Sequence, residues 1–324
     1  MLKDQPVIDV RDLKTYFFTR RGVVKAVDGV SFSLRRGETL GLVGESGCGK
    51  SVTCLSMLRL EPKPAGRIVG GEIFLNGENL LKKNNKEMRQ IRGKYISMIL
   101  QDPMTSLNPV FNIGFQVMES IKIHQGLRGN GLRQKAMEVL ELVRISSPET
   151  RLRNYPHELS GGMRQRVVGA ISLSCQPAVL IADEPTTSLD VTIQAQYLRL
   201  LKDIQRETGV SLIFVTHDLG IVAQVCDEIA VMYAGKIVEK GSVLEIFDHP
   251  MHPYTQALLA AVPQMESDVK QLFSIKGQPP ILNNLPTGCY FHPRCVHVMD
   301  KCRESYPPTV EVSPGHPVNC WQVI

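Results

Sequence analysis

Long apolar runs are missing from this 324-residue sequence. No apolar stretch reaches the roughly 18 residues that a membrane-spanning helix requires, so the sequence predicts no transmembrane segment. The first residues, MLKDQPVIDV, lack the apolar core of a signal peptide, and we expect a cytosolic protein. In that reducing compartment the eight cysteines are expected to be free thiols or metal ligands rather than disulfides.

Strong charge and repetition are also missing. The net charge of +5 is mild, which fits anionic ligands or a membrane surface without demanding nucleic acid. There is no internal repeat, low-complexity segment or long heptad run. With 43% hydrophobic residues, the chain is long enough for a large core in one big domain or two smaller ones.

What is present is an alternation of short apolar runs with Gly-rich turns and helical segments. Two continuous apolar runs, AVLIADEP and SLIFVTHD, flank a helical pattern, which predicts a parallel α/β sheet whose strand ends carry a site. Further strands are expected at 7–18, 24–34 and 38–44, and helices at 51–60, 192–209 and through much of about 102–172. From about residue 250 prolines cluster and helical periodicity fades, which predicts a separate C-terminal extension, 251–324.

The segment GESGCGKS, residues 44–51, matches the P-loop pattern and lies between a strand and a helix, the context that the motif needs. Its backbone N–H groups are suited to ring a β-phosphate, Lys50 to reach the β- and γ-phosphates, and Ser51 to bind Mg²⁺. Cys48 is interpreted as a small residue that fits the loop. The candidate phosphate-binding residues are Gly44, Glu45, Ser46, Gly47, Cys48, Gly49, Lys50, Ser51 and Val52.

Two carboxylates stand at the end of a predicted buried strand, in VLIADEP. Asp183 is suited to hold Mg²⁺ directly or through water, and Glu184 to polarise an attacking water.

The segment LSGGMRQR holds two adjacent glycines, which are costly inside a helix. They suit a turn at a helix start, where bare N–H groups approach an anion. Ser160, Gly161 and Gly162 are therefore predicted to contact phosphate.

Together these motifs resemble an ATP-binding cassette (ABC) ATPase, and LSGGM resembles the family signature LSGGQ, with Met163 in the last place. In that family the signature of one subunit covers the γ-phosphate of ATP held by the P-loop of another. The resemblance further implies that Gln101 contacts Mg²⁺ and water, that Asp190 belongs to the D-loop at a dimer interface, and that His217 contacts the γ-phosphate.

The resemblance also implies an aromatic ring stacked on adenine near the N-terminus. TYFF offers Tyr16, Phe17 and Phe18, and the register favours Phe17. The implied fold is an ABC-type P-loop domain over 1–250, with a parallel or mixed sheet core, an antiparallel β-subdomain and a helical subdomain at about 102–172.

The segments QDPMTSLNPV, DEPTTSLDVTIQAQ and HPMHPYTQALLAAVP narrow the resemblance to ATPase subunits of oligopeptide and dipeptide importers. That family implies ATP hydrolysis coupled to transport at the cytoplasmic face of the plasma (inner) membrane. The implied partners are a second, related but different ATPase, two transmembrane permease subunits and, indirectly, an extracytoplasmic substrate-binding protein. Importers of nickel, glutathione or oligosaccharides share much of the pattern.

The C-terminal extension carries Cys289, Cys295, Cys302 and Cys320. Four cysteines in a Pro-rich segment suggest a metal site. Zinc sites usually contain close C-x₂₋₄-C pairs, which are missing here, whereas iron–sulfur clusters tolerate other spacings. The family resemblance implies a 4Fe–4S cluster, while zinc and free thiols stay open.

Two other classes of function use parts of this pattern. A soluble ABC protein acting on ribosomes or DNA usually has two cassettes or a long coiled coil, and this sequence has neither. A redox or iron sensor gated by ATP would make the cysteine-rich extension the main functional element.

Overall fold

The computed structural model describes residues 5–101, 103–187, 189–262 and 274–324. The chain divides into two compact units. The first unit comprises the stretch up to Ile8, Leu34–Glu38 and Lys82–Phe214, and the second comprises Asp9–Ser33, Thr39–Leu81 and Val215–Ile324.

The second unit contains a four-stranded sheet that forms the predicted β-subdomain. Its strand order is β2-β1-β4-β5, and β4 pairs with β5 antiparallel. Alternating burial along β1 fits a sheet with one covered face. The strands are β1 (Ile8–Thr19), β2 (Gly22–Leu34), β4 (Gly66–Leu75) and β5 (Glu78–Asn79), followed by the 3-10 turn η1 (Leu80–Lys82).

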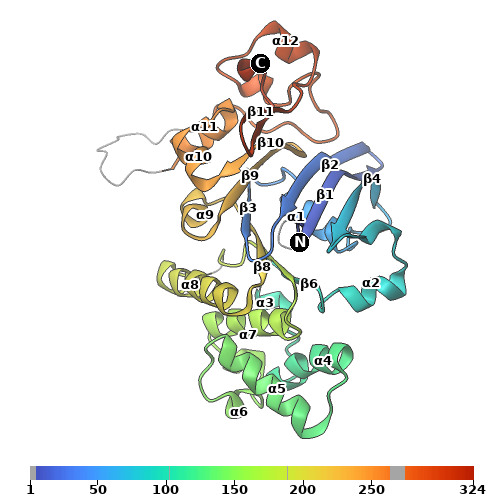
Figure 1. The fold of residues 1–324 in the computed structure, drawn as a ribbon, viewed down its shortest axis with the longest axis vertical. Coiled ribbons are helices and arrows are strands. Elements are labelled where there is room, and N and C mark those ends of the chain that lie inside the picture. The colour runs from blue at the N-terminus through green and yellow to red at the C-terminus, as the bar shows by residue number, and fades with distance from the viewer. Residues whose placement is uncertain (1–4, 102, 188, 263–273) are drawn as a thin grey trace. The chain divides into compact units, whose positions relative to one another are not determined.

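The second unit also carries the strand that leads into the P-loop. β3 (Thr39–Val43) is fully buried and pairs parallel with β9 (Glu228–Tyr233). β9 pairs antiparallel with β10 (Lys236–Ser242), so the sheet is mixed. The helices of this unit, labelled in Figure 1, are α1 (Lys50–Met57), α9 (Leu219–Val225), α10 (Val243–Asp248), α11 (Pro253–Ala260) and α12 (Asp300–Glu304).

The end of the C-terminal extension joins this sheet. β12 (His316–Val318) pairs antiparallel with β10, placing Val318 opposite Glu239, and β11 (Val310–Ser313) pairs with β12. The 3-10 turns η3 (His292–Arg294) and η4 (Trp321–Val323) complete the extension. The boundary near residue 250 stays a prediction, but the residues beyond it pack within the second unit rather than apart from it.

The first unit is built around parallel strands and the predicted helical segment. β6 (Ile96–Ile99) pairs parallel with β7 (Val179–Asp183), and β8 (Ser211–Thr216) follows β7 in the sheet. The helices are α2 (Asn85–Ile91), α3 (Pro103–Ser106), α4 (Ile113–Gln125), α5 (Gly129–Leu142), α6 (Pro148–Arg151), α7 (Gly161–Leu173) and α8 (Val191–Thr208), with the 3-10 turn η2 (Pro156–Glu158).

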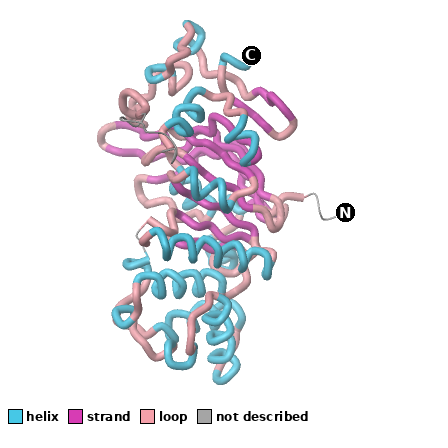
Figure 2. The backbone as a smooth tube through the Cα atoms, turned by 90° about the vertical axis from the view of Figure 1, so that its left-hand side faces the viewer, coloured by secondary structure: helices cyan, strands magenta, loops and turns pink. Residues whose placement is uncertain are grey.

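Within the first unit, α4, α5 and α7 pack against one another, and Figure 2 shows this helical cluster in cyan. Val117, Ile121 and Leu140 are fully buried there. The expected mixed sheet and helical segment are confirmed.

Candidate nucleotide-binding site

The P-loop in the second unit requires glycine at two positions. Gly44 has φ 154°, and a Cβ atom there would lie 2.2 Å from the carbonyl oxygen of Met232. Gly49 has φ 107°, and its Cβ would lie 2.2 Å from the carbonyl oxygen of Ala26. Any side chain at either position would therefore push the loop off the strands beneath it.

Lys50 begins α1 and curls back over the loop. Its Nζ donates to the carbonyl oxygens of Gly44 at 2.7 Å and Glu45 at 3.0 Å. Ser51 and Val52 follow in the first turn of α1, while Ser46 and Gly47 form the exposed tip of the loop.

Cys48 is buried in the loop, and this burial raises the pKa of its thiol. Its Sγ lies 3.8 Å from the Nζ of Lys50. A buried neutral thiol agrees with its interpretation as a small residue that fits.

The three candidate aromatic side chains on β1 differ in their contacts and in their exposure. The Tyr16 hydroxyl donates to Oδ1 of Asp28 at 2.6 Å, and burial raises the pKa of Tyr16. Phe18 is exposed and lies under the guanidinium of Arg67. Phe17 is half-buried on the same face of β1 as Thr15, since residues two apart share a face. The assignment of the adenine ring to Phe17 stays a prediction.

His217 is exposed directly after β8, and it belongs to the second unit with the P-loop. Asp218 caps α9 by accepting hydrogen bonds from the N–H groups of Gly220 and Ile221. His217 is thus held between the end of a buried strand and the start of a capped helix.

The strand-end carboxylates and Gln101 belong to the first unit. Asp183 is the last residue of β7 and is almost fully buried. Glu184 follows with φ 45°, the left-handed region that side chains rarely adopt. Its Oε2 accepts from Nε2 of Gln101 at 3.0 Å and from Oγ1 of Thr187 at 3.2 Å. The structure therefore brings Gln101 and Glu184 together, as a joint role requires.

The signature segment, residues 159–163, places its glycines at the start of α7 as predicted. Ser160 is the N-cap, and its Oγ accepts from the N–H of Met163 at 3.4 Å. A Cβ on Gly162 would lie 2.9 Å from Cγ2 of Ile193 on α8. Gly162 therefore allows α7 and α8 to pack closely.

Asp190 caps α8, and its Oδ1 accepts from the N–H of Ile193 at 3.0 Å. The N-termini of α7 and α8 open into one hollow of about 570 Å³. Its lining includes Arg144, Ser160, Gly161, Met163, Arg166 and Asp190. Two helix N-termini and two guanidinium groups favour an anion there, although the carboxylate of Asp190 lines the same hollow and opposes it.

Several residues of this site, among them Arg144, Thr187 and Gln165, were not singled out from the sequence. Gln165 on α7 is fully buried, and its Nε2 donates to the carbonyl oxygen of Pro185 at 2.7 Å. This bond ties the signature helix to the loop that carries Glu184. An amide side chain inside an otherwise apolar helix face is the signal that marks it.

The four cysteines of the C-terminal extension gather, but not as a ligand set. The N–H of Cys289 donates to the carbonyl oxygen of Cys302 at 2.8 Å. Burial raises the pKa of Cys289 to about 11, and the neighbouring charges of Cys302, Cys320 and Cys295 act in the same direction. Within the described residues, however, no three His, Cys, Asp or Glu side chains are arranged to hold a metal ion.

No helix in the described ranges is both long and apolar enough to span a membrane.

The P-loop, the strand-end carboxylates and the signature segment at a helix N-terminus define an ABC-type ATPase. The family model for ABC transporters matches residues 27–187, and the model for the oligopeptide/dipeptide transporter C-terminal region matches residues 238–302. Solved ABC cassettes share the fold. MJ0796, in a dimeric post-hydrolysis state bound to ADP and Pi, is 23% identical with a TM-score of 0.65 over 73% of this chain and 98% of its own.

Curated relatives match along the whole chain. The dipeptide transport ATP-binding protein DppD of Bacillus subtilis is 50% identical over 98% of this chain and 95% of its own length. OppD, the oligopeptide transport ATP-binding protein of the same organism, is 50% identical over 99% of this chain and 90% of its own length. A probable peptide ABC transporter ATP-binding protein of Sinorhizobium fredii, y4tR, is 51% identical over 98% of this chain and 95% of its own length.

The chain belongs to the ATP-binding subunits of ABC transporters, in the oligopeptide/dipeptide branch. Proteins of this class are ATPases that couple hydrolysis to transport, and ATP with Mg²⁺ is the expected cofactor pair.

Proposed function

We propose that this chain hydrolyses ATP to drive the uptake of dipeptides or oligopeptides, as one of two cassettes paired head-to-tail. The second cassette is a related but different chain. Two transmembrane permease subunits carry the peptide, which an extracytoplasmic binding protein delivers. The chain itself lies at the cytoplasmic face of the membrane as a peripheral subunit.

One observation supports this proposal most directly. The N-termini of α7 and α8 line one hollow with Arg144 and Arg166, and Ser160 caps the first of these helices. This arrangement suits the γ-phosphate of a nucleotide bound to the partner cassette, because fixed N–H dipoles stabilise charge that develops during transfer.

The remaining residues divide the chemistry between them. Lys50 and His217 stabilise the charge of the γ-phosphate. Ser51, Gln101 and Asp183 offer the oxygen ligands that Mg²⁺ prefers. When bound, this ion neutralises phosphate charge.

Glu184 aligns the attacking water and accepts its proton. The bonds from Gln101 and Thr187 to Oε2 orient the carboxylate. A general base must be held within hydrogen-bond reach of the proton that it takes, and these two donors supply that positioning.

The variant Glu184→Gln tests this role. It keeps the size and hydrogen bonding of the side chain but cannot accept the proton, so we expect ATP binding to remain and turnover to fall at least about 100-fold. Single-site turnover with labelled ATP is the measurement. The exposed Glu149→Gln on α6 is the control and should change nothing. Unchanged turnover in Glu184→Gln would refute the assignment.

The proposed contact with the permeases lies near Gln101. Leu100, Val110, Phe111 and Phe115 are large apolar side chains with exposed fractions between 41% and 74%, and the two phenylalanine rings stack at 4.5 Å. The exposed, stacked pair Phe111 and Phe115 is of the kind found on binding surfaces. Co-purification with two membrane chains supports this proposal, whereas co-purification with ribosomal RNA would support the ribosome-associated alternative.

The proposed cargo is a dipeptide or an oligopeptide. Peptides are favoured by the relatives named above, while nickel, glutathione or oligosaccharides are the alternatives. Uptake of a labelled dipeptide into vesicles that contain the reconstituted transporter distinguishes them.

The finer proposal for the C-terminal extension is a 4Fe–4S cluster on Cys289, Cys295, Cys302 and Cys320, with zinc as the alternative. The proximity of the four thiols supports it, but their side chains do not form a ligand set in the described residues. Measuring the iron, sulfide and zinc content after anaerobic purification distinguishes the cluster from zinc. About four irons and four sulfides per chain would establish the cluster, and stoichiometric zinc would replace it.

A further inference from the structure

Glu45 is the second residue of the P-loop, and the C-terminal extension holds its side chain. Arg294 donates from Nη1 to Oε2 at 2.6 Å and from Nη2 to Oε1 at 3.0 Å. The Arg294 side chain is only 4% exposed and the Glu45 side chain 26%. Two parallel charge-assisted bonds in a largely buried setting are a strong and directional contact.

Arg294 is itself fixed in place by its surroundings. Its Nε donates to the carbonyl oxygen of Lys276 at 3.1 Å, and its Nη1 lies 3.4 Å from the Tyr233 hydroxyl. The hydrogen bond to Glu45 is the main cause of a raised pKa of Arg294. The guanidinium is thus presented to the P-loop by residues of the sheet and of the extension.

The backbone of Glu45 is held as well. Its N–H donates to the hydroxyl oxygen of Tyr254 on α11 at 2.9 Å. The Tyr254 ring is fully buried against Tyr233 at 4.6 Å and Phe291 at 5.4 Å. Side chain and main chain of one P-loop residue are therefore both bound from beyond residue 250.

A second contact reaches β2, the neighbour of the strand that carries the adenine-stacking candidates. Tyr290 donates to Oδ2 of Asp28 at 3.1 Å, while Tyr16 donates to Oδ1 of the same carboxylate. The N–H of Lys25 donates to the carbonyl oxygen of Leu282 at 3.1 Å. The extension thus binds both the P-loop and the β1–β2 hairpin.

We propose that the C-terminal extension shapes the phosphate-binding loop, with Arg294 as a positioning residue that anchors Glu45 and neutralises its charge. A carboxylate in a loop that must bind a polyanion repels the ligand unless a cation is paired with it. Arg294 supplies that cation and fixes the direction of the loop. The inference rests on the proposed assignment of the P-loop to ATP.

Equilibrium binding of Mg·ATP to the full chain tests the inference. Arg294→Ala leaves an unpaired carboxylate beside the phosphates, and we expect the dissociation constant to rise about 10-fold or more. Arg294→Lys keeps the charge but loses the two-pronged geometry, so its effect should be intermediate. Arg303→Ala, an exposed arginine of the same extension, is the matched control and should bind normally.

The double variant Arg294→Ala/Glu45→Gln distinguishes an effect of Arg294 that acts through Glu45 from a general effect of Arg294 on packing. Without the carboxylate, loss of Arg294 should cost no more than about 3-fold in affinity relative to Glu45→Gln alone. Equal losses in both backgrounds would show a general packing role and overturn the inference, as would normal binding by a folded Arg294→Ala. If Arg294→Ala does not fold, Arg294→Lys with and without Glu45→Gln makes the same comparison.

Lys50→Ala separates this inference from the proposed function. If Lys50→Ala retains ATP binding, the P-loop assignment itself fails. If Lys50→Ala loses binding and Arg294→Ala does not, only the role of the extension fails.

Discussion

At the scale of single residues, His252 lies in an unusual environment. It is buried, and its Nδ1 accepts a hydrogen bond from the N–H of Tyr254 at 3.0 Å. Its Nε2 is buried without a hydrogen-bond partner among the described residues. Burial lowers the pKa of His252 to about 3 from its usual 6.5. The ring is therefore held neutral in the folded state.

This shift predicts acid sensitivity. Because the unfolded chain binds the proton below about pH 6.5 and the folded chain does not, stability is complete above that pH and falls toward pH 3. The loss should be about 2 kcal/mol at pH 5. Urea unfolding at pH 7 and pH 5 measures it.

His252→Gln should flatten this dependence, whereas the exposed His249→Gln should leave it unchanged. An equally steep decline in His252→Gln would show that other groups cause the acid sensitivity.

At the scale of elements, the close packing of α7 on α8 decides how the signature segment is presented. A Cβ at Gly162 would meet a methyl group of the stiff, β-branched Ile193 at 2.9 Å, but a Cβ at Gly161 would meet nothing within 4 Å. Gly162 is therefore needed for the close packing of α7 on α8, whereas Gly161 is not.

Gly162→Ala is expected to destabilise the protein by about 1–3 kcal/mol through overpacking. Gly161→Ala is the matched control, and by its better helix propensity it should be neutral or slightly stabilising. Thermal unfolding compares the two. Equal melting temperatures would mean that α7 and α8 separate without cost.

Several elements were predictable because their signals are local, whereas β4, β6, β9 and β10 were not singled out from the sequence. AVLIADEP and SLIFVTHD are continuous apolar runs that end in polar residues, and they form β7 and β8. Gly44 and Gly49 of the P-loop occupy positions where the backbone requires glycine. β12 was not predicted, because a three-residue strand containing proline has no pattern of its own and forms by pairing with β10.

The site was predictable as motifs but not as contacts. The bond between Gln101 and Glu184 joins residues 83 positions apart, and that between Arg294 and Glu45 spans 249 positions. The hydrophobic periodicity of a single sequence does not predict which distant residues will pair. The extension therefore looked separate in the sequence, since only its composition was visible.

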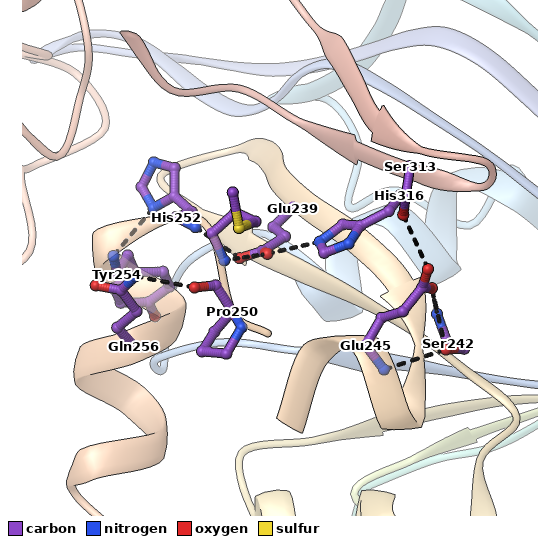
Figure 3. Close-up of polar contacts among 10 residues, drawn as sticks. Glu239, Ser242, Glu245, Pro250, His252, Tyr254, Gln256, Ser313 and His316 are labelled. Atoms are coloured by element: carbon purple, nitrogen blue, oxygen red, sulfur yellow. Dashed lines mark hydrogen bonds and ion pairs between the residues drawn. The ribbon is translucent and has the colours of Figure 1, made fainter. Parts of the chain in front are cut away.

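At the scale of the whole chain, buried polar contacts hold the C-terminal extension to the rest of the second unit (Figure 3). Glu239 on β10 is fully buried and accepts from the N–H groups of Met251 and His252. Nε2 of His316 on β12 lies 2.8 Å from its Oε1. One buried carboxylate thus joins β10, the turn before α11 and the last strand.

His316→Ala should lower the free energy of unfolding by about 2–3 kcal/mol, because it leaves Glu239 short of a buried partner. Ser313→Ala, which removes a bond from the same hairpin to Glu245, is the control and should cost about 1 kcal/mol. Chemical denaturation measures both. A smaller loss in His316→Ala than in Ser313→Ala would contradict this view of how the extension is attached.

The ion pair between Glu45 and Arg294 also has a consequence for the chain while it is being synthesised. A ribosome makes Glu45 249 residues before Arg294, which at about 5–20 residues per second is roughly 12–50 seconds. During that interval the carboxylate of Glu45 in the nascent P-loop lacks its Arg294 partner. A chain interrupted after His217 and before Arg294 would present every nucleotide motif yet hold ATP poorly, so such unfinished subunits would be kept from consuming it.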